Sequence, residues 1–157
     1  MSSISVVVVD DHPLMVVAIS NLLNRARGFE VVGTGARAND IVELCERSKP
    51  QIAVVGLRMP GDVYAALPIA IKFSPSTKIV AFTAASGVDP AIRALDAGAS
   101  GYVLKGSSTN ELLDAISAVL SGETYVTPAF ASNVIAALQD ASRRRRAAEA
   151  VMLSIRE

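Results

Sequence analysis

The chain has 157 residues, of which 51% are hydrophobic and 19% are charged. This composition is sufficient for one ordinary domain with a buried core, and it argues against a disordered chain. Lys and Arg together number 15, as do Asp and Glu, so net charge indicates neither a nucleic-acid partner nor an acidic substrate.

The cysteine content and the apolar runs exclude further classes. Cys45 is the only cysteine, so we expect no disulfide framework and no cysteine-rich metal site, but a small apolar residue on a helix. No apolar run is long enough for a membrane span, and the N-terminus lacks the segments of a signal peptide. We therefore expect a soluble cytoplasmic protein with no membrane partner.

Strand and helix patterns alternate along residues 1–122. The first strand is the β-branched run "ISVVVV" at 4–9, which is apolar throughout and typical of a strand buried on both faces. Further strands are expected at 29–34, 51–55, 77–83 and 101–105. Helices are expected at 12–26, 38–48, 62–74 and 89–98, with a fifth after the last strand. This alternation predicts a five-stranded parallel sheet with helices on both faces.

Two local signals concern the helices. Pro68 should break or kink the helix at 62–74, because proline removes a backbone donor. Ser108 and Glu111 have the spacing of a capping box at the start of the fifth helix.

The C-terminal region departs from the alternating pattern. After Gly122 comes a short extended piece, and then a helix that Pro128 begins. Its apolar stripe consists of Phe130, Val134, Ile135 and Leu138. We predict a domain at 1–122, a helical linker at 123–152 and a third segment at 153–157.

Polar residues follow three of the expected strands. Asp10 and Asp11 follow the first strand, Thr83 ends the fourth and Lys105 ends the fifth. Because the carboxyl ends of parallel strands share one rim, we expect these side chains to lie close together. Two adjacent carboxylates need a cation and favour Mg²⁺, whereas a lysine and a hydroxyl can bind the oxygens of a phosphoryl group. Gly56 follows the third strand and brings no side chain to this rim.

The motifs "VVDDHP", "GLRMPG", "AFTA" and "GYVLK", in this order, resemble the receiver domain of two-component response regulators. The likeness covers residues 4 to about 122, and "DDHP", "GASGYVLK" and "SGETYVTPAF" are most similar to the NarL/FixJ subgroup. The resemblance implies a flavodoxin-like (βα)5 receiver fold and a signal-receiving module that is not an enzyme.

The resemblance also implies roles for the rim residues. Asp10 and Asp11 would hold Mg²⁺ together with the backbone carbonyl of Arg58. Thr83 would be the switch hydroxyl that closes onto the phosphoryl group, and Lys105 would pair with the same group. The aromatic residue that changes rotamer on activation would be Tyr102.

The family places its phosphate-accepting aspartate two residues before the Arg of "RMPG", where this chain has Gly56. In-line displacement needs a nucleophilic oxygen, which glycine lacks, and Mg²⁺ also loses a carboxylate ligand. We therefore predict that the usual aspartyl phosphate does not form. Gly56 is then an engineered block or a natural degenerate receiver, unless Asp62 substitutes as the acceptor. The segment "PGDVYAAL", shorter than the family's usual one, favours the natural variant.

The expected partners follow from the same resemblance. A sensor histidine kinase is the expected partner, and a homodimer is compatible with the sequence. Residues 153–157, "LSIRE", resemble the opening of a LuxR-type helix-turn-helix domain, here truncated, through which alone DNA would be bound. The alternatives are a stand-alone, phosphorylation-independent interaction module and a flavodoxin-like flavin or nucleotide binder, although "DDHP" after the first strand would repel phosphate.

Overall fold

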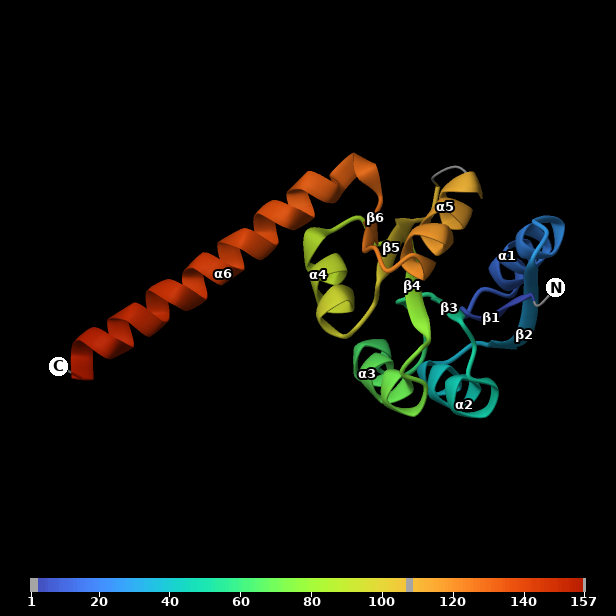
Figure 1. Ribbon diagram of the computed structural model, residues 1–157, viewed down its shortest axis with the longest axis horizontal. Coiled ribbons are helices and arrows are strands. Elements are labelled where there is room, and N and C mark those ends of the chain that lie inside the picture. Colours follow the sequence, from blue (N-terminus) through green and yellow to red (C-terminus); the bar gives the residue numbers. More distant parts are fainter. Residues whose placement is uncertain (1–2, 107–108, 157) are drawn as a thin grey trace. The chain divides into compact units, whose positions relative to one another are not determined.

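The computed structural model describes residues 3–106 and 109–156 (Figure 1). Its centre is a parallel sheet with the strand order β2-β1-β3-β4-β5-β6. The strands are β1 (Ile4–Val9), β2 (Phe29–Gly35), β3 (Ile52–Val55), β4 (Lys78–Thr83), β5 (Gly101–Leu104) and β6 (Tyr125–Val126). The predicted parallel α/β sheet is confirmed.

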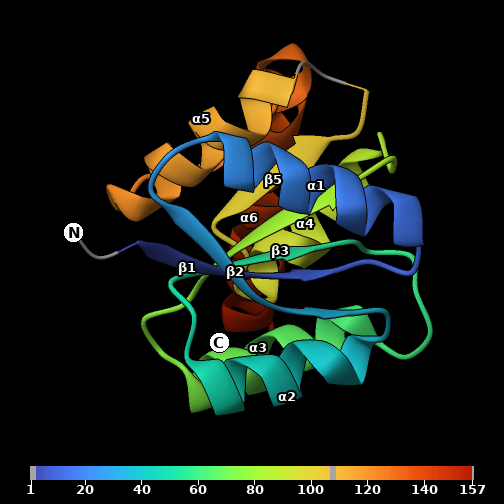
Figure 2. The same ribbon diagram turned by 90° about the vertical axis from the view of Figure 1, so that its right-hand side faces the viewer.

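The helices are α1 (Pro13–Arg25), α2 (Ala38–Ser48), α3 (Val63–Phe73), α4 (Val88–Asp96), α5 (Thr109–Leu120) and α6 (Pro128–Arg156). Figure 2 shows α1 and α5 on one face of the sheet and α2 and α3 on the other. Helices on both faces explain why β1 is apolar throughout, since Val6, Val7, Val8 and Val9 are all fully buried. Cys45 is buried on α2, as expected.

The core between the sheet and the α1/α5 layer comes from alternate residues of the strands. Val6 and Val8 of β1 pack with Leu23 of α1 and Ile116 of α5 in one buried cluster. Side chains alternate across a strand, so the odd-numbered valines of β1 face the other layer. Because β1, β3, β4 and β5 are parallel neighbours in the sheet, their carboxyl ends lie side by side at one edge of this core.

The prediction of five strands was wrong, because β6 adds a sixth. Tyr102 of β5 pairs with Val126 of β6, and the backbone N–H of Thr127 donates to the carbonyl of Tyr102. The Thr127 hydroxyl then accepts a hydrogen bond from the N–H of Leu104, at 3.0 Å. A strand of two residues is too short to show alternation, so the sequence indicated only an extended piece.

Pro68 was predicted to break or kink this helix, and a break is wrong, since α3 continues through this residue to Phe73. Pro68 is exposed, whereas its neighbours Leu67 and Ala70 are fully buried. The buried face of α3 therefore stabilises the helix despite one missing backbone hydrogen bond. The capping box predicted for Ser108 and Glu111 is not tested, because Ser108 lies outside the described residues.

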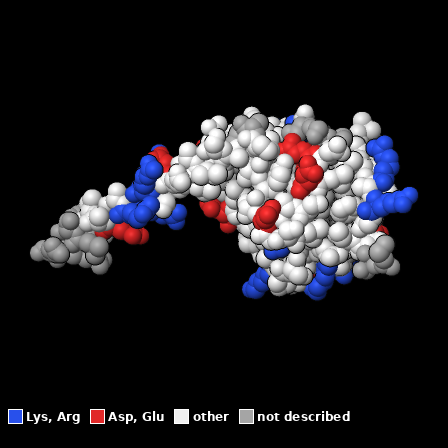
Figure 3. All heavy atoms as spheres, turned by 45° about the horizontal axis from the view of Figure 1, so that its top comes forward, with Lys and Arg blue, Asp and Glu red and all other residues white. Residues whose placement is uncertain are grey.

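The chain divides into two compact units, Met1–Thr127 and Pro128–Glu157. The first unit includes β6 and so extends past the domain boundary predicted at residue 122. The second unit is α6, one continuous helix that includes most of the segment expected as a helical linker, 123–152. Its exposed arginines at 143–146 stand out in Figure 3, and Arg144 pairs with Asp140 at 2.6 Å. In the described part of the chain, no helix has the length and apolar character needed to cross a bilayer.

Candidate functional site

Four neighbouring strands end at the same edge of the sheet and enclose a cavity of about 200 Å³, here called the Gly56 cavity. Its lining residues are Asp10, His12, Gly56, Leu57, Arg58, Thr83, Ala84 and Lys105. The structure therefore brings together residues that lie far apart in the sequence and that were expected to share one rim.

Asp10 is the buried charge of this site, with 4% of its surface exposed. Its Oδ2 atom lies 2.9 Å from Nζ of Lys105, and its Oδ1 accepts the backbone N–H of His12 at 2.9 Å. Burial by itself would raise the pKa of Asp10, but the hydrogen bonds from Lys105 and His12 outweigh it, so the pKa lies below its ordinary value. Asp10 is therefore a carboxylate at neutral pH, neutralised by Lys105.

His12 is a site residue that the sequence reasoning missed. Its Nδ1 atom lies 3.0 Å from Oδ1 of Asp10 and 3.1 Å from Oδ1 of Asp11. A single histidine before Pro13 predicts only an exposed residue at a helix start, and its side chain is indeed 68% exposed. The sequence does not show that the turn into α1 brings its ring to the two carboxylates. Asp10, Asp11 and His12 each offer one ligand atom within 4.8 Å of the others.

Thr83 and Tyr102 are joined through the backbone of Ala85. The Thr83 Oγ1 accepts the N–H of Ala85 at 3.1 Å, and the Tyr102 hydroxyl donates to the carbonyl of Ala85 at 2.7 Å. Both side chains are buried, and burial raises the pKa of Tyr102 to about 12, so its hydroxyl stays protonated. The loop after β4 is thus held by the two residues to which the family resemblance assigns switch roles.

Gly56 lies against Asp10. Its backbone N–H donates to the carbonyl of Val9 at 2.9 Å, which fixes it beside β1. A Cβ atom built on Gly56 would lie 2.8 Å from Oδ2 of Asp10. The Asp10 carboxylate therefore occupies the place where a side chain at position 56 would begin, and any larger residue requires Asp10 to shift.

The geometry agrees with the comparison to known families. The model of the response regulator receiver domain matches residues 6–117, which is more than half of the chain. The chain belongs to this family. The resemblance inferred from the sequence motifs is thus confirmed, and the six-stranded parallel sheet with its helices is a receiver fold.

The receiver has relatives of the NarL and LuxR kinds. It is 32% identical to the response regulator GacA of Pseudomonas aeruginosa over 132 residues, which cover 83% of this chain and 62% of that protein. The chain thus spans less than two thirds of the length of this curated relative.

Solved receiver structures give the same picture. A LuxR-family two-component response regulator from Aurantimonas sp. SI85-9A1 is 33% identical, with a TM-score of 0.80 over 85% of this chain and 96% of that one. The signal receiver domain of NarL from Mycobacterium tuberculosis is 27% identical, with a TM-score of 0.74 over 78% of this chain and 100% of that one.

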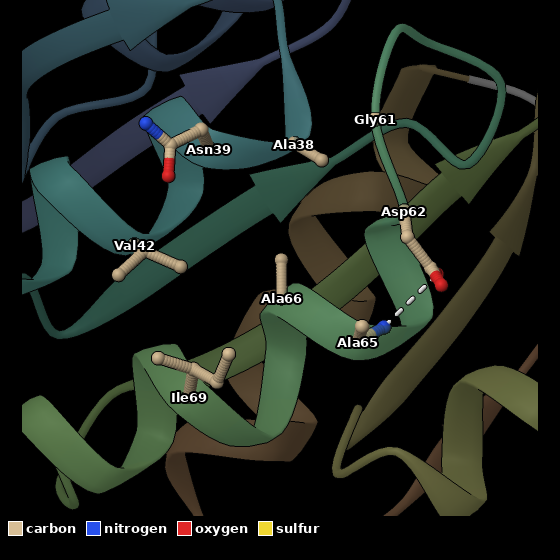
Figure 4. A pocket seen from close by; sticks show the side chains of 8 residues that line it. All are labelled: Ala38, Asn39, Val42, Gly61, Asp62, Ala65, Ala66 and Ile69. Atoms are coloured by element: carbon tan, nitrogen blue, oxygen red, sulfur yellow. Dashed lines mark hydrogen bonds between the residues drawn. The ribbon is translucent and has the colours of Figure 1, made fainter.

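Asp62 does not line the Gly56 cavity of this receiver. It is the N-cap residue of α3, where its Oδ1 accepts the N–H of Ala65 at 3.1 Å (Figure 4). It lines instead a second pocket, between α2 and α3. A substitute acceptor at Asp62 would have to leave this cap, so the geometry does not favour that alternative.

Proposed function

We propose that this receiver serves a response regulator that controls transcription, and that Gly56 disables its phosphotransfer. The observation that carries the proposal is the position of Gly56 on the wall of the cavity that Asp10, Thr83 and Lys105 also line. A phosphoryl group arriving there would meet a lysine and a hydroxyl that can bind its oxygens. It would meet no nucleophilic oxygen from position 56 to displace its leaving group.

The residues present fit Mg²⁺ poorly. The family implies Asp10, Asp11 and the carbonyl of Arg58 as ligands, and Mg²⁺ would supply positive charge beside a phosphoryl group. Both oxygens of Asp10 already contact other groups, His12 at Oδ1 and Lys105 at Oδ2. A metal would have to displace Lys105 and would gain one carboxylate fewer than with an aspartate at position 56. We therefore propose that Mg²⁺ binds weakly.

Signalling would then depend on contacts between a partner protein and the loop after β4. Thr83 and Tyr102 both hold Ala85, so a change at either residue would act on the same loop. Such a shared element can have two arrangements whose populations a partner shifts. A sensor histidine kinase is the partner that the family suggests. DNA binding would come from a LuxR-type domain of the kind that residues 153–157 resemble.

A second candidate is a receiver that only binds other proteins, without phosphate. Gly56 favours this candidate as well, because partner proteins can then bind the receiver only in its unphosphorylated form. It differs from the first candidate in having no DNA-binding output.

The proposal is tested by incubating the chain with Mg²⁺ and acetyl phosphate and then measuring its intact mass. We expect no phosphoryl adduct on the wild-type chain. Gly56→Asp should gain an acid-labile, Mg²⁺-dependent adduct, because it restores the nucleophile. Gly56→Asn is the matched control, since it has the same size and makes the same demand on Asp10 but carries no nucleophilic carboxylate. A stoichiometric adduct on the wild-type chain would contradict the proposal.

A folded Gly56→Asp chain that is not labelled would have a different meaning. It would show that Asp10 and Lys105 cannot rearrange around the new side chain, or that the "PGDVYAAL" segment has altered the site further. Thermal unfolding of both variants separates these outcomes from a chain that does not fold.

A further inference from the structure

The Gly56 cavity has hydrogen-bond donors without acceptors. Thr83 is 2% exposed and its oxygen accepts from Ala85, yet its O–H proton has no acceptor among the described residues. Lys105 carries three N–H donors, and within the described chain its ammonium group contacts one side chain, Asp10. The guanidinium group of Arg58, which also lines the cavity, has no acceptor in that part of the chain either.

The carboxylate of Asp10, by contrast, already has partners at both oxygens. The Oδ1 of Asp10 receives the backbone N–H of His12 and lies 3.0 Å from its ring nitrogen, while Oδ2 receives Lys105. A ligand that complements the donors of Thr83, Lys105 and Arg58 must therefore offer acceptors. An oxyanion has this character, and charge-assisted bonds from a lysine favour it further.

Charge and size narrow the class of oxyanion. Lys105 and Arg58 bring two positive charges to the cavity wall and Asp10 brings one negative charge, so a monoanion balances the wall whereas a dianion leaves an excess of negative charge. The cavity volume of about 200 Å³ equals the share of roughly seven water molecules in the liquid, which leaves room for an ion of a few atoms. The group that the family places at position 56 is itself a carboxylate on a short stem.

We propose that the Gly56 cavity binds a small free monocarboxylate, such as formate or acetate, in place of the side-chain carboxylate that glycine lacks. The inference rests on the proposed loss of the acceptor residue, because it uses the space beside Gly56. The bound ion accepts hydrogen bonds from Thr83 and Lys105 and competes with Asp10 for the lysine. The Thr83 oxygen also accepts the N–H of Ala85, whose carbonyl accepts the Tyr102 hydroxyl. Binding of the ion therefore acts on the loop after β4.

The test is a titration of the ¹⁵N-labelled chain with sodium formate and with sodium acetate, against sodium chloride at the same ionic strength and without divalent metal. We expect saturable shifts of the backbone amide signals of Gly56, Ala84 and Lys105. The dissociation constant should be on the order of 1 mM or weaker, because a ligand of so few atoms makes few contacts. Equal shifts with chloride would mean an unspecific ionic effect and would overturn the proposal.

Two variants locate the ion. Lys105→Ala should abolish the saturable shifts, while the matched variant Lys72→Ala, at an exposed lysine of α3, should leave them unchanged. Gly56→Asn should also abolish them, because its side chain fills the space. Retained binding in folded Lys105→Ala or folded Gly56→Asn would overturn the proposal, and the dispersion of the amide spectrum reports whether each variant is folded.

Inorganic phosphate forms the last arm of the test. If phosphate without metal binds more tightly than formate, the cavity selects phosphoryl groups and the monocarboxylate proposal fails. Failure of either kind leaves the proposed function standing as long as Gly56→Asp is phosphorylated and the wild-type chain is not. A phosphoryl adduct on the wild-type chain would defeat the proposed function whatever the formate result.

Discussion

The Gly56 cavity and the pocket between α2 and α3 have similar volumes, about 200 Å³ and about 230 Å³, but very different walls. The α2–α3 pocket is lined by Ala38, Asn39, Val42, Gly61, Asp62, Ala65, Ala66 and Ile69 (Figure 4). Its one charged residue, Asp62, is occupied in capping α3. The Gly56 cavity instead gathers Asp10, Arg58 and Lys105, and some of its donors lack acceptors in the part of the chain that the structure describes. Volume therefore does not distinguish the two regions, whereas the partners of their polar groups do.

Two buried ionisable groups show the same contrast. Burial raises the pKa of the Cys45 thiol on α2 to about 11, and among the described residues only Lys49 favours its charged form. Asp10 is buried as well, but hydrogen bonds from Lys105 and His12 prevail and lower its pKa. Desolvation thus keeps the Cys45 thiol uncharged, whereas hydrogen bonds overcome it at Asp10 and keep that carboxyl charged.

The largest effect that we expect concerns Cys45. A rise of the thiol pKa from 9.0 to about 11 lowers the thiolate fraction near neutral pH about a hundredfold, and burial blocks access further. The folded chain at pH 8 should therefore react with a thiol reagent at least a hundredfold more slowly than the chain in urea. Measured rates in both conditions check this. Equal reaction rates in the two conditions would mean that α2 moves away from the sheet often enough to expose Cys45. The pKa of the thiol would then not be raised by burial, and Cys45 and Asp10 would no longer differ in this way.

The next effect concerns the ion pair at the rim. Lys105→Ala leaves the Asp10 carboxylate buried with His12 alone, so we expect a loss of about 2 kcal/mol in the free energy of unfolding. This is less than breaking a fully buried pair costs, because Lys105 keeps 18% of its side chain in water. Urea denaturation at pH 7 measures the change. The control Lys72→Ala should stay within about 0.5 kcal/mol of the wild type, and a similar loss in both variants would contradict the role of the pair.

The pH dependence of that loss should be smaller still and has a definite sign. The pKa of Asp10 in the folded chain lies below its ordinary value of 3.8, so its contribution to stability is present above that value. The contribution is lost as the pH falls through the lower, folded pKa. The difference in unfolding free energy between wild type and Lys105→Ala should therefore be constant from pH 7 to about 5 and shrink below about 4. Denaturation series with EDTA present would check this, and a difference that grows toward acid would be the wrong sign.

Much of this rim was predictable because each of its residues ends or follows a buried strand. The uninterrupted valines of β1 predict a strand covered on both faces, and in a parallel sheet such strands present Asp10, Thr83 and Lys105 at one edge. That step needs only element order. The same motifs carried the family resemblance, which the match over residues 6–117 confirms.

The pairings at the rim were not predictable in the same way. The contact of Lys105 with Asp10, and of His12 with both carboxylates, depends on distances that packing sets and that sequence spacing does not contain. β6 was missed because two residues carry no periodicity, and it is formed by pairing with β5. Pro68 was misread because local backbone preference was weighed without the buried face of α3.

The smallest effect belongs to the α2–α3 pocket. Ile69 lines this pocket and is 47% exposed, so truncation removes contacts that are already half in water. Ile69→Ala should therefore lower the free energy of unfolding by no more than about 1 kcal/mol, against about 2–5 kcal/mol for an isoleucine in a closed core. It should also leave the formate-dependent amide shifts unchanged, because its pocket shares no lining residue with the Gly56 cavity. Urea denaturation and the same titration measure both. A core-sized loss would place the pocket among the packed parts of the fold, and altered formate binding would show that the two regions are coupled across the sheet.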